Sequence, residues 1–254
     1  MLNIRRFGTG PPIAALHGFS MTGEAFARIA EPLGRTIVAP DLPGHGHSRS
    51  HPTDIDSVTA AVDRFLDALV GPLPLLGYSQ GGRVALLSTV GDRMNVSCLI
   101  LISATPGLDT DAERQARVER DHVLAERIRD IGVDSFIDSW TTSGITATDH
   151  LHDDHRAWDR TVRSENTAGG LAAALRGYGQ GAQPSVWNDL ANLTMPVLLV
   201  TGGRDKLYTE INERMEQLIP NAELAVIDGA GHNPIADRQD ATLESISGFL
   251  DRHG

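Results

Sequence analysis

A serine stands at the centre of a short glycine-rich motif that is typical of an exposed nucleophile. Residues 77–82 read Gly-Tyr-Ser-Gln-Gly-Gly, with an apolar run before them and a helical pattern at 83–87 after them. Glycines at these positions let a strand and a helix approach closely around a strained turn, so that the hydroxyl of Ser79 projects above the edge of a sheet. The motif alone is weak evidence, but its place between a strand and a helix makes Ser79 a candidate nucleophile.

Two later loops offer the partners that such a serine needs, because a serine hydroxyl is a poor nucleophile until a base takes its proton. Asp205 comes shortly after the apolar run Val197–Thr201, and His232 comes shortly after the run Leu224–Ile227. Asp205 alone could cap a helix, and His232 alone could be a hydrogen-bonded loop histidine. With Ser79 upstream, the chain order predicts a catalytic triad in which His232 is the base.

Backbone amides near this triad could bind negative charge that develops on an oxygen atom. The turn His17–Ser20 follows a predicted strand and can present the amide of Phe19, while the helix start after Ser79 presents the amide of Gln80. Neither donation depends on the side chain. Phe19 and Gln80 are therefore the predicted oxyanion-hole donors.

The wider pattern predicts the fold that brings these loops together. Short, β-branched apolar runs are typical of buried parallel strands. They lie at Ile13–Leu16, Thr36–Ala39, Leu73–Leu76, Cys98–Ser103, Val197–Thr201 and Leu224–Ile227. Amphipathic stretches such as 55–70 lie between them, and this alternation predicts a mostly parallel α/β sheet with helices on both faces. Together with the serine motif it predicts the α/β-hydrolase fold, as a single domain over residues 1–254.

The strand pattern is interrupted between Pro106 and Pro196, where helical periodicity and polar loops replace it. We interpret residues 107–190 as an inserted helical cap, with a turn at 141–149 between two of its helices.

A helix predicted at 111–131 within this cap changes character along one face. That face carries Leu124, Ile128 and Ile131, and then, toward the start of the helix, Asp121, Arg117 and Arg114. The polar part could be a solvated surface with ion pairs along the helix. Alternatively, the helix overhangs the active site and its arginines face a substrate carboxylate.

Composition excludes several classes of partner. The chain has 254 residues and a net charge of -11, and the average field of such a protein repels nucleic acids and anionic membranes. Residues 1–18 contain no extended apolar segment, and no run of about eighteen apolar residues occurs anywhere. We therefore expect that the protein is not exported and does not span a membrane. The expected location is cytoplasmic.

Other reactive residue types have structural explanations. Cys98, the only cysteine, lies in an apolar run and is expected to be a buried filler. The stretch 41–48 is rich in Gly and Pro and is expected to form a structured turn. His150, His152 and His155 lie among Asp and Arg without zinc-type partners, so we expect no metal and no organic cofactor.

These motifs resemble the MenH family of the α/β-hydrolase superfamily, whose members make 2-succinyl-6-hydroxy-2,4-cyclohexadiene-1-carboxylate (SHCHC) in menaquinone biosynthesis. The resemblance rests on the serine motif extended to Arg83, on the cap run 106–117, and on the sequence Arg-Ser-Glu-Asn at 163–166. It implies that the substrate pocket is lined by Tyr78, Arg83, Arg117, Trp140 and Arg163, with Lys206 beside the acid. The family's substrate carries several carboxylates, so the implied partner is a small anionic carboxylate, which a cluster of cations fits.

The resemblance implies a lyase reaction. Ser79, made basic by His232 and Asp205, would remove a ring proton, and pyruvate would be eliminated from 2-succinyl-5-enolpyruvyl-6-hydroxy-3-cyclohexene-1-carboxylate. A carboxylesterase or lactonase is the main alternative, because it would use the same triad for acyl transfer through a serine ester. A non-enzymatic receptor or scaffold is a third. The cationic cap favours the synthase, because an ordinary esterase pocket is apolar.

Overall fold

The computed structural model describes residues 1–91, 95–142, 144–148 and 150–254. Within these ranges, seven strands form one sheet. The strands are β1 Ile4–Phe7, β2 Pro12–Leu16, β3 Thr36–Pro40, β4 Leu73–Tyr78, β5 Val96–Ile102, β6 Val197–Gly202 and β7 Ala222–Ile227. Their order across the sheet is β1-β3-β2-β4-β5-β6-β7. Only the pair β1 and β3 is antiparallel among the described strands. The mostly parallel α/β sheet predicted from the sequence is confirmed.

All six predicted apolar runs are strands, but β1 was missed. Its four residues, Ile-Arg-Arg-Phe, alternate between exposed and half-buried positions at the edge of the sheet. A strand this short and polar carries little hydrophobic pattern, so its pairing with β3 comes from tertiary structure rather than from local sequence.

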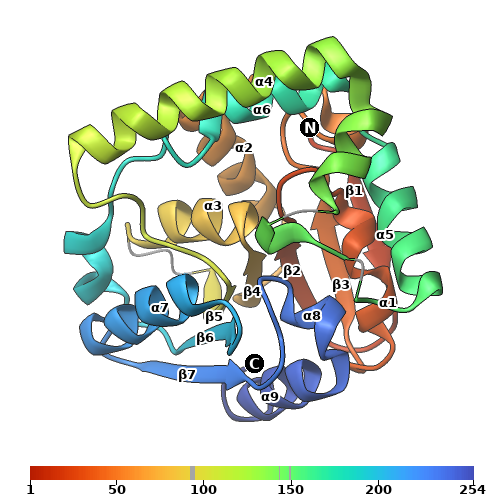
Figure 1. Cartoon of the computed structure of the whole chain (residues 1–254). Helices are drawn as coiled ribbons and strands as arrows, with labels where there is room; N and C mark the ends of the chain where they lie inside the picture. The colour runs from red at the N-terminus through yellow and green to blue at the C-terminus, as the bar shows by residue number, and fades with distance from the viewer. Residues whose placement is uncertain (92–94, 143, 149) are drawn as a thin grey trace.

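Helices cover both faces of the sheet. They are η1 Gly23–Phe26, α1 Ala27–Ala30, η2 Gly46–Ser48, α2 Ile55–Asp67, α3 Gln80–Thr89, α4 Asp111–Trp140, η3 Gly144–Thr146, α5 Asp153–Ser164, α6 Ala168–Tyr178, η4 Trp187–Asn192, α7 Lys206–Leu218, α8 Pro234–Asp237 and α9 Gln239–His253. Apolar residues of α2, α3 and α7 form one core cluster, while those of α1 and α9 form another. Successive residues of β5 alternate between the two clusters, so the sheet is buried on both sides. Figure 1 shows α2 and α3 on one side of the sheet and α9 on the other.

The helices α4, α5 and α6 lie between β5 and β6, together with the short helices η3 and η4. The helices α4 and α6 pack side by side along the top of the molecule in Figure 1. They have an apolar cluster of their own, built from Ala125, Ile128, Phe136, Ile137, Leu171, Ala172 and Leu175. This segment therefore has a small core that is separate from the two cores of the sheet.

The helix α4 runs further than the predicted 111–131. It begins with a capping box between Thr110 and Glu113 and continues to Trp140 through a break at Gly132, where φ is 79° and ψ is 168°. The inward position expected for Ile131 is wrong, since 38% of this residue is exposed. It lies next to the break, where the helical phase of the apolar face is lost. Two residues of the predicted turn at 141–149, residues 143 and 149, lie outside the described residues.

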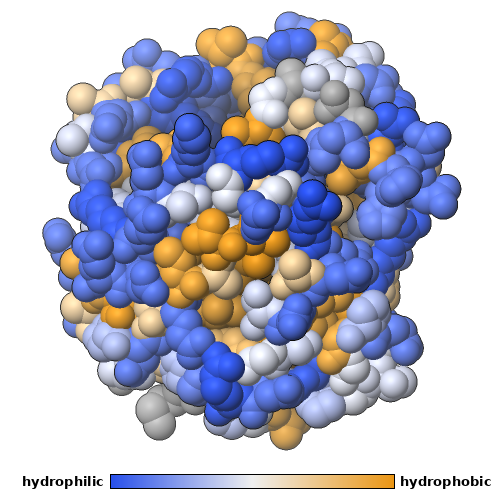
Figure 2. Space-filling model, turned by 60° about the horizontal axis from the view of Figure 1, so that its bottom comes forward, coloured by the Kyte–Doolittle hydropathy of each residue, from blue (hydrophilic) through white to orange (hydrophobic). Residues whose placement is uncertain are grey.

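The surface carries few large apolar side chains. Figure 2, in which the lower part of Figure 1 comes forward, shows a mainly hydrophilic face with an apolar area near its centre. In the part of the chain that the structure describes, no helix is both long and apolar enough to cross a membrane.

Candidate active site

Ser79 joins the end of β4 to the start of α3 in a backbone conformation that few residues other than glycine adopt. Its φ is 50° and its ψ is -110°, a strained combination of the kind that is concentrated at functional sites. The glycines around it make the turn possible. A Cβ on Gly77 would lie 2.5 Å from the Cα of Gly82, and one on Gly81 would lie 2.1 Å from the carbonyl oxygen of Leu16. The motif thus sets the hydroxyl at the carboxyl edge of the sheet, as predicted.

Three predicted residues meet at this edge. The Oγ of Ser79 lies 3.0 Å from the Nε2 of His232, and the Nδ1 of His232 lies 2.7 Å from the Oδ2 of Asp205. With Nδ1 donating to the carboxylate, Nε2 is the nitrogen that can accept the serine proton. Asp205 also caps α7, because its other oxygen accepts a hydrogen bond from the amide of Tyr208 at 3.4 Å. One carboxylate thus fixes both the helix and the imidazole.

Tyr208 is a neighbour of the triad that sequence analysis missed. Its ring lies edge-on to the ring of His232 with 4.5 Å between the centroids. Burial raises the pKa of Tyr208, so the phenol stays neutral. The available signal was its position three residues after Asp205, which returns it to the same side of α7.

The turn that presents Phe19 is held from several directions. The amide of Ser20, whose φ is 62°, donates to the Nε2 of His45 at 3.3 Å. The side chain of Asn166 donates to the carbonyl of Ser20 at 2.8 Å, and Arg163 donates to the Ser20 hydroxyl. Burial lowers the pKa of His45 to about 3, so its ring stays neutral and keeps an acceptor nitrogen. The loop 41–48, expected only to be a structured turn, therefore supports the predicted oxyanion donor.

Gln80 is the first residue of α3. Amides in the first turn of a helix have no acceptor within that helix, and the dipole of α3 favours negative charge at the same place. The amides of Gln80 and Phe19 both belong to residues that border the same cavity.

This cavity, of about 130 Å³, brings most of the predicted site residues together. They are Phe19, Tyr78, Ser79, Gln80, Arg83, Arg117, Trp140, Arg163 and His232. The sheet edge supplies the serine and the histidine, α3 supplies Arg83, and the helices α4 and α5 supply the rest of the cationic lining. Asp205 lies behind His232 rather than in the wall of the cavity.

Arg83 is a buried cation with no carboxylate partner among the described residues. Its Nη1 donates to the side chain of Gln183 at 2.9 Å and to the carbonyl of Tyr178 at 3.3 Å. Burial, together with repulsion from Arg117, lowers the pKa of Arg83 to about 10. The guanidinium is still charged at neutral pH. A buried charge without a counter-ion is costly, so this position favours an anion in the cavity.

The other two arginines have carboxylate partners on their own helices. The Nε of Arg163 lies 2.6 Å from the Oδ2 of Asp159, and the Nε of Arg117 lies 2.8 Å from the Oδ1 of Asp121. Arg163 is buried, whereas 34% of the Arg117 side chain is exposed. On the α4 face, Arg117 therefore has an ion pair along the helix and also borders the cavity. Arg114 pairs with a neighbouring aspartate on α4 instead.

Lys206 is the one predicted pocket residue that lies elsewhere. It is exposed at the start of α7 and borders an adjoining cavity of about 540 Å³. That cavity shares Tyr78, Arg163 and His232 with the first and also contains Arg204. Lys206 does not border the cavity beside Ser79, but it shares the adjoining cavity with Asp205 and His232.

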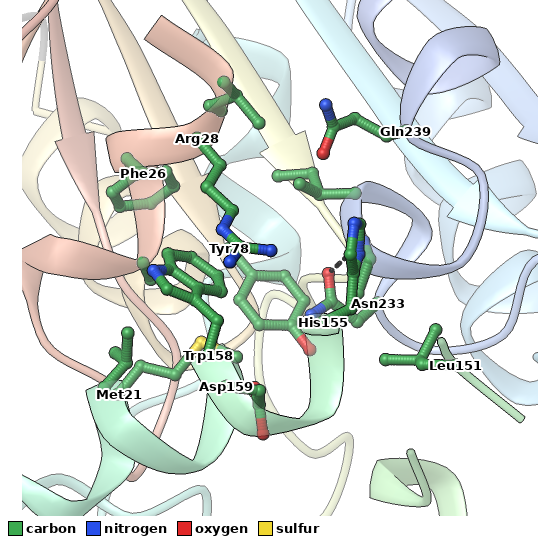
Figure 3. A pocket seen from close by; sticks show the side chains of 15 residues that line it. Met21, Phe26, Arg28, Tyr78, Leu151, His155, Trp158, Asp159, Asn233 and Gln239 are labelled. Carbon is green, nitrogen blue, oxygen red and sulfur yellow. Dashed lines mark hydrogen bonds between the residues drawn. The ribbon is translucent and has the colours of Figure 1, made fainter. Parts of the chain in front are cut away.

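Tyr78 forms part of the wall of a third, smaller cavity of about 40 Å³. Figure 3 shows its ring next to Trp158, with Asp159 and His155 from the same helix α5 close by. Burial raises the pKa of Tyr78, so its phenol stays neutral. The residue borders both this small cavity and the cavity that contains Ser79. Asp159, the partner of Arg163, links the two spaces and was not identified from the sequence.

Comparison with known proteins agrees with this fold. The Alpha/beta hydrolase family model matches residues 13–245. A Bacillus subtilis protein provisionally named SHCHC synthase is 30% identical over 245 residues, which cover 94% of this chain and 89% of that protein. An Escherichia coli O1:K1 protein named SHCHC synthase is 29% identical over 249 residues, which cover 94% of each. The structure of MenH from S. aureus has a TM-score of 0.93 and 28% identity, and covers 99% of both chains.

This chain belongs to the MenH family of α/β hydrolases. The family membership confirms the resemblance found in the sequence and places the chain among enzymes.

The histidine group of this MenH family member is dispersed by the fold. His150 contacts Asp237 at 2.7 Å between Nε2 and Oδ1, whereas His155 borders the small cavity. Within the described ranges, no group of three His, Cys, Asp or Glu side chains could hold a metal ion.

Proposed function

We propose that this MenH family member is a lyase that eliminates pyruvate from 2-succinyl-5-enolpyruvyl-6-hydroxy-3-cyclohexene-1-carboxylate and thereby forms SHCHC. Relatives with that synthase name match nearly the whole chain. The single observation that carries the proposal is Arg83, which is buried beside Ser79 and His232 without a carboxylate partner in the described residues. A substrate carboxylate would supply the missing counter-charge.

The names of substrate and product define the bonds that change. The ring double bond at C3 of the substrate is replaced by double bonds at C2 and C4, so C2 loses a proton and C5 loses the enolpyruvyl oxygen. The succinyl ketone and the ring double bond both acidify that C2 proton. Its electron pair moves through the ring and breaks the C5–O bond, and the enolpyruvate that leaves takes up a proton to become pyruvate. Neither water nor an oxidant is consumed.

The triad would act as the base in this elimination. Ser79 removes the C2 proton while its own proton passes to Nε2 of His232, 3.0 Å away. Asp205, 2.7 Å from the other ring nitrogen, stabilises the imidazolium that forms. The imidazolium of His232 then gives its proton to the departing enolpyruvate, while Ser79 keeps the proton taken from C2. No covalent serine ester is required.

The amides of Phe19 and Gln80 would stabilise the enolate oxygen that develops on the succinyl ketone. Two fixed donors at this position act on charge that is present only during the reaction, which is the kind of interaction that lowers a barrier. The contacts that hold Ser20 to His45 and Asn166 keep the Phe19 amide in place.

The helices α4 and α5 would serve as a cap over the substrate. Arg117 and Trp140 come from α4 and Arg163 comes from α5, so the cationic wall of the cavity belongs largely to this insertion. A small molecule with several carboxylates is the partner that such a wall suits.

The test is a comparison of two specificity constants on the same enzyme preparation. Pyruvate release from the enolpyruvyl substrate should be at least about a hundredfold more efficient than cleavage of p-nitrophenyl esters, because a neutral acyl group supplies no counter-charge to Arg83. Efficient ester cleavage without detectable pyruvate would instead assign the triad to a carboxylesterase or lactonase.

A further inference from the structure

The carboxamide of Gln80 is buried but has no hydrogen-bond partner among the residues that the structure describes. Only 2% of the residue is exposed, and neither Nε2 nor Oε1 bonds to any described residue. A carboxamide can donate two hydrogen bonds and accept two. Buried polar groups are nearly always paired, so an unpaired group beside a reaction cavity points to a partner that the free chain does not supply.

The geometry of α3 places this side chain on the side of the cavity. Gln80 and Arg83 are three residues apart and therefore share one face of the helix. The opposite face lies against the sheet, because a Cβ on Gly81 would meet the carbonyl oxygen of Leu16 at 2.1 Å. Gln80 and Arg83 both border the cavity that contains Ser79. The carboxamide is thus next to the reacting serine and the unpaired cation.

We propose that the side chain of Gln80 recognises the hydroxy-acid edge of the substrate, with Nε2 donating to the ring carboxylate and Oε1 accepting from the neighbouring 6-hydroxyl. This inference rests on the proposed function, in which hydroxyl and carboxylate stand on adjacent ring carbons. A carboxamide offers a donor and an acceptor side by side, which matches that pair. The arginines of the cavity carry donors only, so they can hold carboxylates but cannot accept the hydroxyl proton.

The first experiment removes one hydrogen-bonding partner at a time. Gln80→Met replaces the carboxamide with an apolar side chain of similar length and leaves the backbone amide in place. SHCHC and 2-succinylbenzoate, which is SHCHC without the elements of water, keep the same carboxylates but differ in the hydroxyl. Their inhibition constants are measured in the pyruvate-release assay with the parent enzyme and with the variant.

We expect the preference for SHCHC over 2-succinylbenzoate to shrink by about tenfold or more in Gln80→Met. The difference in ring shape between the two ligands affects both enzymes alike, so a change in the preference reports the contact with the hydroxyl. The specificity constant for the enolpyruvyl substrate should fall by a similar factor. Gln80→Glu, which keeps the shape but repels the carboxylate, should lose more. This second variant also provides a result if the methionine variant does not fold.

Thr201→Val is the matched control. The hydroxyl of Thr201 is also buried without a partner in the described part of the chain, but the residue lies near the end of β6 outside the cavity. Both substitutions remove an unpaired buried polar group, so neither should lower the melting temperature. Only Gln80→Met should lose activity, while Thr201→Val should stay within about twofold of the parent.

Two outcomes overturn the inference while leaving the proposed function intact. One is a Gln80→Met enzyme with the parent's specificity constant. The other is a variant with lower activity but an unchanged preference between the two ligands, which would mean that Gln80 only shapes the cavity. A parent enzyme that releases no pyruvate overturns the proposed function itself, and this inference with it.

Discussion

The triad and the arginine cluster face one cavity but are positioned by different parts of the molecule. Ser79, Asp205 and His232 follow the parallel strands β4, β6 and β7, and contacts of 3.0 Å and 2.7 Å join them. The arginines come from α3, α4 and α5, and each has a different set of partners. The sheet edge therefore fixes the reacting atoms. The packing of separate helices decides which arginines already have a carboxylate partner and which remain available to a substrate carboxylate.

The largest effect should come from the sheet edge. Ser79→Ala should lower the turnover number by about a thousandfold or more, with a melting temperature that is unchanged or higher because the elbow is strained. His232→Ala should behave in the same way, and the double variant should be little worse than either, since the pair acts as one unit. Steady-state pyruvate release and thermal unfolding provide both measurements. Substantial activity in Ser79→Ala would remove the serine from the mechanism.

The sheet edge should also make the protein sensitive to acid. Burial lowers the pKa of His17 to about 4 and that of His45 to about 3, from an ordinary value of 6.5. Below pH 6.5 the unfolded chain therefore binds protons that the folded chain does not bind. The stability that these residues contribute is complete above that pH and is lost as the pH falls toward 4, at about 1.4 kcal/mol per pH unit for each histidine.

Urea unfolding between pH 6.5 and about 4 measures this slope. His17→Gln removes one of the two titrating groups and should make the loss of stability visibly less steep. Equal slopes in the parent and the variant would show that His17 is already protonated in the folded state.

Among the arginines, Arg83 and Arg117 should differ in both activity and stability. Arg83→Met should lower the specificity constant roughly thirtyfold or more, by analogy with truncated charge pairs at interfaces. The same substitution should raise the melting temperature, because it removes a buried charge that has no counter-ion. Arg117→Ala should cost only about tenfold, because Asp121 already holds part of its charge. It should lower the melting temperature, because it leaves the buried Asp121 unpaired.

The pH dependence of KM separates the two arginines further. Because the pKa of Arg83 is lowered to about 10, this residue loses its charge as the pH rises through that value. KM for the anionic substrate should rise there in the parent enzyme and at a higher pH in Arg117→Ala, which lacks the repulsion from Arg117, but it should not rise in the Arg83 variant. Equal losses of the specificity constant in the Arg83 and Arg117 variants, with melting temperatures that change in the same direction, would contradict the difference that the structure shows.

The two regions also differ in how far the sequence predicts them. The strands, the turn around Ser79 and the order of the triad have local patterns, because glycine spacing and apolar runs are dictated by the backbone. The partners of the arginines have no such pattern. That Arg163 meets Asp159 follows from helical spacing, but that Arg83 meets Gln183 depends on a contact across 100 positions of the chain. The missed strand β1 is a tertiary feature of the same kind, whereas the missed Tyr208 had a local signal in its spacing of three residues from Asp205.

Lys206 provides the smallest and most discriminating prediction. Resemblance to the family placed it in the substrate pocket, whereas the structure places it, exposed, on the adjoining cavity with Arg204. A cation in that position attracts an anionic substrate through solvent and is screened by salt, because the Debye length is only about 8 Å at physiological ionic strength. Lys206→Ala should therefore lower the specificity constant by no more than about threefold at low salt, and the difference should vanish at high salt.

A direct contact would behave differently from this long-range attraction. Salt screens much less the charge of a lysine that binds a carboxylate in a partly dry cavity. Removal of such a lysine would lower the specificity constant tenfold or more at any salt concentration, and each factor of ten corresponds to roughly 1.4 kcal/mol. A salt-independent loss of that size in Lys206→Ala would mean that the start of α7 moves when substrate binds. In that case the cationic wall would be shared between the sheet edge and the inserted helices, and the division between the two regions would apply only to the free enzyme.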